Sequence, residues 1–152
     1  DALNLKVGYT SEERSQLNTY NVNTLLTDSQ NSILIWGART TSSGLNLKYV
    51  AVSRFLMYLA ESIEEGTQWV ASEINAEPLW IRVRQRIDDF LYLNWRSGAL
   101  MGTNPDDAYF VRCDATTMTV SDISNGRLKC LYGLAVTKPA EFEILWLEQN
   151  TL

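Results

Sequence analysis

Two groups of carboxylates have a spacing that could support catalysis. Glu61, Glu64 and Glu65 lie close together, and Asp88 and Asp89 are adjacent. Paired carboxylates hydrolyse glycosidic bonds when one donates a proton and the other attacks the sugar or activates water. Both groups fall on the polar side of helix-like patterns, and neither lies beside an aromatic loop that would shape a sugar cleft. A solvated helix face is therefore the stronger interpretation.

Three arginines at alternate positions could instead bind phosphate. They are Arg82, Arg84 and Arg86. Alternate positions on a helix point in different directions, so only Arg82 and Arg86 share a face, and Asp89 lies within reach of both. The sequence has no glycine-rich phosphate loop beside them. The net charge of -5 also argues against a general nucleic-acid binder.

The chain has no histidine, which excludes Ser-His-Asp triads, Cys-His pairs and the common metal sites. Cys113 and Cys130 both lie in strand-like apolar runs, and two cysteines without histidine do not make the usual zinc site. We expect them to be small buried apolar residues in a reducing compartment. The residues alone thus indicate an interaction or structural module.

One apolar segment is expected at the centre of the fold. Residues 33–40 read Ile-Leu-Ile-Trp-Gly-Ala-Arg-Thr. Four consecutive apolar residues predict a strand covered on both faces, in the middle of a sheet. Gly37 lets the backbone turn, and the Arg39 guanidinium can hold loop carbonyls or a carboxylate. We therefore expect Trp36, Gly37 and Arg39 to have structural roles.

Two segments have the period of amphipathic helices. In residues 48–65 one apolar stripe contains Val52, Phe55, Leu56, Leu59 and Ile63. In a second segment, ending at Ser97-Gly98, the predicted buried side contains Trp80, Val83, Ile87, Phe90, Leu91 and Asn94. Asn75 is the predicted N-cap of this second helix, with Pro78 in its first turn. A shorter helix is expected to start at Ser11.

The remaining segments predict strands. Residues 3–7 indicate a half-buried strand or an extended arm, and residues 22–26, 108–113 and 127–136 favour strands. Residues 141–148 alternate, with Phe142, Ile144 and Trp146 on one face. The order predicts an α+β fold, a two-layer domain with a mixed β-sheet and two long amphipathic helices packed on one face. The sequence shows no transmembrane window and no signal peptide.

Several short motifs follow one another in a fixed order over nearly all of the chain from about Asn21 onwards. They are Asn23; Trp36-Gly37-Ala38-Arg39-Thr40; Lys48-Tyr49-Val50 leading into Arg54; Glu73 with Asn75; Trp80; Phe90-Leu91; Trp95; Gly98; Leu100; Gly102; Phe110-Val111-Arg112-Cys113-Asp114; Asn125-Gly126; and Lys138-Pro139-Ala140-Glu141-Phe142. This ordered set resembles the carboxy-terminal, polymer-forming domain of contractile tail sheath proteins of phages, tailocins and extracellular injection systems. Residues 71–75 depart from the aromatic-acid-Pro-Asn sequence that is common there.

The resemblance implies a structural subunit, not an enzyme, which polymerises helically around an inner tube and contracts to drive the tube through a target cell envelope. It implies no cofactor, no nucleic acid and no membrane insertion. The implied partners are neighbouring sheath subunits, the inner tail tube protein, the baseplate and the tail terminator. The implied location is a virion or injection-particle tail, assembled in the bacterial cytoplasm.

The resemblance also implies domain boundaries and contacts. Residues 1–20 would be an arm and short helix that link to an upstream part, since the chain begins at Asp1 without a methionine, and residues 21–152 would be the sheath domain. Terminal arms of such subunits add strands to neighbouring sheets. We expect this strand exchange to use Leu3, Leu5, Val7, Phe142, Ile144 and Trp146.

A contact that must hold before contraction and release afterwards suits exposed charges, because such pairs are individually weak. We place the tube contact on Arg82, Arg86 and Asp89, and we expect Arg54 to be structural. Two alternatives stay open: a baseplate-associated carbohydrate-cleaving enzyme that uses the acidic pairs, and a small nucleic-acid-binding module that uses the arginines.

Overall fold

The computed structural model describes residues 5, 7–30, 32–44 and 47–152. The chain divides into two compact units, which we call the hairpin unit (Asp1–Arg54) and the helix–sheet unit (Phe55–Leu152). Helices and antiparallel sheets together confirm the predicted α+β class. No helix in the described part of the chain is long and apolar enough to cross a membrane.

The hairpin unit begins with α1 (Ser11–Thr19). The helix starts at Ser11, as predicted, and its N-cap is Thr10: the Glu13 amide donates to Thr10 Oγ1, and the Thr10 amide donates to Glu13 Oε2 at 2.8 Å. This reciprocal capping box satisfies amides that have no partner inside the helix. None of the nine residues of α1 is buried, so the cap and not packing fixes where this helix starts.

The strands β1 (Thr24–Thr27) and β2 (Ile33–Trp36) form an antiparallel two-stranded ribbon, in which Leu25 faces Ile35. The predicted buried central strand is therefore wrong. Ile35 is 76% exposed and Trp36 is 53% exposed. Four apolar residues in a row leave apolar side chains on both faces of a strand, but in the described part of this unit no second layer covers them. Thr24 is the one buried residue described here.

Residues 3–7 were expected to form a half-buried strand or an extended arm, and no strand is observed in the described ones. Leu5 and Val7 lie in no helix or strand, and Val7 is exposed. Leu3 lies outside the described residues.

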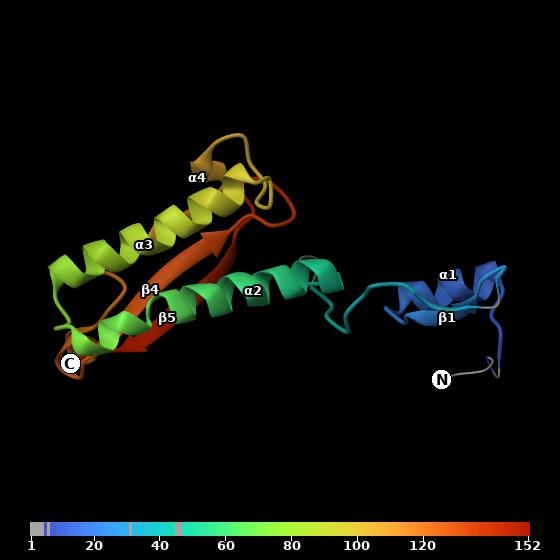
Figure 1. The fold of residues 1–152 in the computed structure, drawn as a ribbon, viewed down its shortest axis with the longest axis horizontal. Helices are drawn as coiled ribbons and strands as arrows, with labels where there is room; N and C mark the ends of the chain where they lie inside the picture. Colours follow the sequence, from blue (N-terminus) through green and yellow to red (C-terminus); the bar gives the residue numbers. More distant parts are fainter. Residues whose placement is uncertain (1–4, 6, 31, 45–46) are drawn as a thin grey trace. The chain divides into compact units, whose positions relative to one another are not determined.

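The helix–sheet unit contains a three-stranded sheet in the order β3 (Tyr109–Arg112), β4 (Arg127–Leu134), β5 (Glu143–Asn150). Both pairings are antiparallel, so the expectation of a mixed sheet is wrong. The helices α2 (Val50–Gly66) and α3 (Glu77–Arg96) lie on one side of this sheet (Figure 1), which confirms the two-layer arrangement. Shorter helices complete the unit: η1 (Gln68–Ser72), α4 (Pro105–Ala108) and α5 (Val120–Ser124).

The core of the helix–sheet unit lies between the two layers. The apolar period predicted its helical half correctly, since Leu59 and Ile63 on α2 and Val83 and Ile87 on α3 are buried. From β4, alternate residues point inward because side chains of a strand alternate between its faces. These inward residues are Leu128, Cys130, Tyr132 and Leu134.

Asn75 does not cap α3, contrary to the prediction. Ala76 is the N-cap residue, and Asn75 is buried. Its Nδ2 donates to the Arg127 carbonyl at 3.1 Å, and its Oδ1 accepts from Trp80 Nε1 at 2.7 Å. Asn75 thus joins the start of α3 to the start of β4.

Candidate interaction surfaces

The carboxylates do not form a common site. Glu61, Glu64 and Glu65 are exposed on α2. Asp88 lines a depression with Tyr109, whereas Asp89 lines a groove between α2 and α3. Burial raises the pKa of Asp88, and the charge of Asp89 raises it further. In the described residues, no group of three or more His, Cys, Asp or Glu side chains could hold a metal ion.

The structure brings the three predicted tube-contact residues together on α3. Arg82, Arg86 and Asp89 line one surface hollow with Trp69 and Gln85. Arg82 Nη2 lies 2.8 Å from Glu73 Oε2, and its guanidinium lies over the Trp69 ring, 5.1 Å from the centroid. The hydrogen bond from Arg82 lowers the pKa of Glu73.

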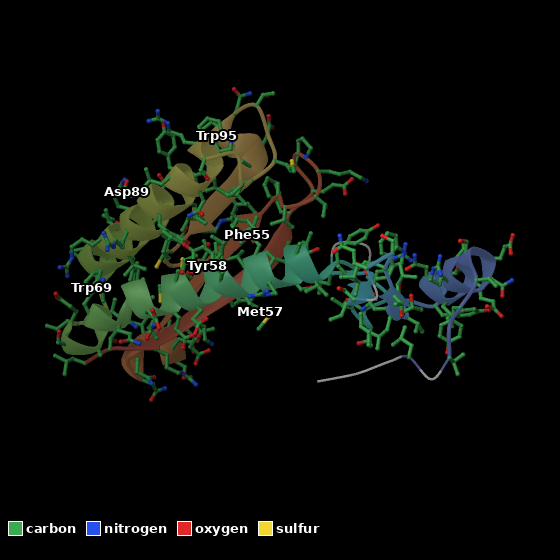
Figure 2. The ribbon with its side chains drawn as sticks, turned by 45° about the vertical axis from the view of Figure 1, so that its right-hand side comes forward. Phe55, Met57, Tyr58, Trp69, Asp89 and Trp95 are labelled. Carbon is green, nitrogen blue, oxygen red and sulfur yellow. The ribbon has the colours of Figure 1, made fainter. Side chains whose placement is uncertain are left out.

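Arg86 and Asp89 also border an apolar groove of about 250 Å³ between α2 and α3. Its apolar lining includes Ile63, Phe90 and Leu93, and Leu93 is 64% exposed. The Tyr58 ring lies 6.5 Å from Phe90, centroid to centroid. In Figure 2 the side chains of Phe55 and Tyr58 lie on the same side of α2, and Met57 points to the other side. The helix layer therefore presents an apolar groove with charges at its border, which the sequence did not reveal.

The opposite face of the sheet carries a second apolar surface, which we call the outer-face patch. Ile144 and Trp146 on β5 point away from the helices and are 51% and 58% exposed. Trp146 stands opposite Leu131 on β4. Nearby, the Phe110 ring lies across Gly133, and Phe142 meets it edge-on with centroids 5.2 Å apart. The patch consists of Phe110, Leu131, Phe142, Ile144 and Trp146.

The strand β5 is firmly held in its own sheet. Among the described strands it pairs only with β4, so it is an edge strand. Leu147 is buried in the core, and the Leu152 amide donates to the Glu73 carbonyl at 2.9 Å. Gln149 Nε2 donates to the Glu64 carbonyl at 3.0 Å. These contacts hold β5 and the end of the chain against their own unit.

Four residues were expected to be structural, and two of them take part in a local network. The Asn23 side chain accepts from the Arg39 amide at 2.9 Å and donates to the Arg39 carbonyl at 2.8 Å, while the Arg39 guanidinium donates to the Asn18 carbonyl. Gly37 has φ +127°, and a side chain there would meet Asn23 Oδ1 at 2.6 Å. Trp36 and Arg54 are exposed.

A buried carboxylate that the sequence analysis did not single out fixes α5 against β4. Asp122 Oδ1 lies 2.9 Å from Lys129 Nζ and 3.1 Å from Arg127 Nη2, and Oδ2 accepts from the Thr119 amide and hydroxyl. The hydrogen bonds from Thr119 and Lys129 hold the pKa of Asp122 well below its usual range. At neutral pH this group is therefore a structural anion and not a proton donor.

Comparison with solved structures identifies proteins of similar fold and sequence. A chain in the PVC sheath complex of an extracellular contractile injection system, in the contracted state, is 36% identical, with a TM-score of 0.75, over 92% of this chain and 40% of that one. A chain in the contracted helical sheath of the anti-feeding prophage is 34% identical, with a TM-score of 0.76, over 93% of this chain and 40% of that one. A chain in the baseplate structure of the same prophage is 34% identical, with a TM-score of 0.79, over 92% of this chain and 39% of that one.

A more distant similarity supports the fold alone. A sheath tail protein from Listeria innocua is 10% identical, with a TM-score of 0.69, over 97% of this chain and 35% of that one. No family model matches the chain, and no curated protein does. The chain spans about two fifths of the length of the injection-system proteins. These matches confirm the resemblance that the ordered motifs indicated.

Proposed function

We propose that this chain, which resembles the sheath proteins of contractile injection systems, is the polymer-forming part of a sheath subunit. The observation that carries the proposal is its 36% identity, over 92% of its length, to a chain of a contracted sheath complex. As such a part it would polymerise with copies of itself around an inner tube and shorten to drive the tube forward. Its further partners would be a baseplate and a tail terminator. The role requires no catalytic step, no cofactor, no nucleic acid and no membrane insertion. We place its assembly in the bacterial cytoplasm and its working location in the tail of a phage or injection particle.

The outer-face patch is our candidate for the contact between neighbouring subunits. Tryptophan is among the residues that contribute most to protein association, and Trp146 is the most exposed residue of the patch. A neighbour's extended segment can add a strand beside β5, because an edge strand offers backbone groups for pairing. Residues 3–7 of a neighbour would supply that strand, with Leu3, Leu5 and Val7 on one side of it. In this scheme β5 receives a strand and does not leave its own sheet.

Truncation of two patch residues in the full-length parent protein tests this contact. We expect Ile144→Ala with Trp146→Ala to abolish sheath polymers in negative-stain electron microscopy while the purified subunit keeps its far-UV circular dichroism. Ile74→Ala is the matched control, since Ile74 is 74% exposed but lies outside the patch. Leu147→Ala should instead lower the free energy of unfolding by about 2–5 kcal/mol, because Leu147 is buried. Sheaths of normal length from the double variant would refute the contact.

The charged border of the α2–α3 groove is our candidate for the tube contact. Arg82 already pairs with Glu73 and stacks on Trp69, so Arg86 and Asp89 are the more available charges of the three predicted residues. Exposed charges suit a contact that must later release, because water and salt weaken each pair.

Charge reversal separates tube binding from self-assembly. We expect Arg86→Glu to reduce co-sedimentation of the full-length subunit with purified tubes, and to leave polymerisation without tubes unchanged. Arg84→Glu is the control, because it makes the same charge change at an exposed position of α3 outside the hollow and the groove. If both variants bound tubes equally well, Arg86 would not belong to the tube contact.

A further inference from the structure

Cys113 and Cys130 stand opposite each other on neighbouring strands. The register pairs Tyr109 with Leu134 and Arg112 with Leu131. One further step along this antiparallel ladder places Cys113 opposite Cys130. Both are free thiols and both are buried. The two cysteines are far apart in the sequence but lie directly opposite each other in the sheet.

The type of pair can be identified from the hydrogen bonds. The Ala135 amide donates to the Ala108 carbonyl at 2.8 Å, so Ala108 and Ala135 form a hydrogen-bonded pair. Hydrogen-bonded and non-hydrogen-bonded pairs alternate along an antiparallel ladder, and Cys113 with Cys130 falls on a non-hydrogen-bonded position. In such pairs the Cα atoms are about 4.5 Å apart, which lies within the roughly 4.4–6.8 Å that disulfides span.

The ladder ends directly after the two cysteines. Thr117 Oγ1 accepts from the Asp114 amide at 3.2 Å and donates to the Lys129 carbonyl at 2.8 Å. The hydroxyl therefore lies between two backbone groups that would otherwise face each other as the next pair. Cys113 is the last residue before this opening, where a strand end can move enough to admit a small reagent. A hydrogen bond with Cys113, together with burial, raises the pKa of the Cys130 thiol. We expect Cys113 to react first because it lies at the end of the strand, next to this opening.

We propose that Cys113 and Cys130 form a redox modification site, at which a low-molecular-weight disulfide oxidises the folded protein to a cross-strand disulfide. The Cys113 thiolate attacks the small disulfide and displaces one of its halves as a thiol. Cys130, on losing its proton, then attacks the mixed disulfide and displaces the other half. Two protein thiols thus become one disulfide, and the small disulfide is reduced to two thiols.

The bond would join β3 to β4 across the segment that contains α5. It would close a loop of about 18 residues, which the chain-entropy model predicts to raise Tm by roughly 15 °C in a domain of the size of the helix–sheet unit. The inference does not depend on the proposed function. An extracellular particle would, however, expose the pair to oxidising surroundings, where disulfides persist.

Oxidation of the reduced, folded chain by oxidised glutathione tests the proposal. After alkylation of free thiols under denaturing conditions, we expect an intact mass that has lost two hydrogens and carries neither alkyl nor glutathione groups. Proteolytic fragments should show the Cys113 peptide linked to the Cys130 peptide. Tm should rise, and dithiothreitol should reverse the rise.

Controls make a negative result decisive. Cys113→Ala and Cys130→Ala should each show no rise in Tm with the same oxidant, and the urea-unfolded wild-type chain shows that the oxidant is active. The proposal is overturned if the folded wild-type chain keeps two alkylatable thiols while the unfolded chain is oxidised. It is equally overturned if the folded chain forms only disulfides between molecules or stable glutathione adducts.

Discussion

Gly133 provides the space in which the Phe110 ring lies on the sheet, and the replacement Gly133→Ala tests this packing. A methyl group at Gly133 would lie 2.2 Å from Phe110 Cε1. Carbon atoms in ordinary contact are about 3.5–4.0 Å apart, so the ring must retreat by roughly 1 Å or more. Phe142 meets the same ring edge-on, so the retreat also weakens an aromatic pair worth about 0.5–1.5 kcal/mol. We expect Gly133→Ala to lower the free energy of unfolding by about 1–3 kcal/mol.

The sign of this effect should reverse when the ring is removed. In a Phe110→Ala background the ring that the added methyl would meet is absent, and Gly→Ala then stabilises by about 0.4–1 kcal/mol because the unfolded chain loses conformational freedom. Urea denaturation of the four proteins of this cycle, followed by tryptophan fluorescence, gives the coupling free energy. Gly66→Ala serves as a control, since a methyl there has no atom within 4 Å. Additive effects of Gly133→Ala and Phe110→Ala would refute the clash as the cause.

Three further perturbations test other contacts in the chain. Asn75→Ala should lower the free energy of unfolding by about 1–3 kcal/mol in urea titrations, because it removes the hydrogen-bond partners of Trp80 Nε1 and of the Arg127 carbonyl. A loss below about 0.5 kcal/mol would contradict this role. Because the folded-state pKa of Asp122 is lowered, its contribution to stability is complete above the unfolded-state pKa of about 3.9 and is lost as the pH falls through the folded-state value. Thermal unfolding of Asp122→Asn should therefore depend less on pH below about pH 4 than that of the wild type, and identical profiles would exclude Asp122 as the source. Ile35→Thr should change the free energy of unfolding of the isolated chain by less than about 0.5 kcal/mol, because Ile35 is exposed; a large loss would mean that the ribbon face is already covered.

The helices could be predicted from the sequence because their signal is local. Burial of Leu59 and Ile63, and of Val83 and Ile87, follows from a period that spans only a few residues. Asn75 shows the limit of local signals, since a residue suited to capping was used for a hydrogen bond to a strand 52 positions away.

The strands were predicted less well because their environment is not local. The sequence of an apolar run such as β2 does not show whether another layer covers the strand. In β5, both alternating sets contain large apolar residues, and only the register with β4 determines that Leu147 enters the core while Trp146 faces outward. The Cys113–Cys130 juxtaposition likewise depends on register, so residue spacing could not reveal it.

The central position of β4 has a consequence for amide hydrogen exchange. β4 is the one described strand with a partner on each side, and its inward side chains fill the core of its unit. Those of its amides that bond to β3 or β5 can exchange only when that strand separates from it, which requires the core to open. The amides of α1 are protected by a nine-residue helix with no buried side chain, a length at which isolated helices fray readily. In deuterium, α1 should therefore exchange by local fraying long before β4, and the slowest amides of β4 should report the global stability of the helix–sheet unit.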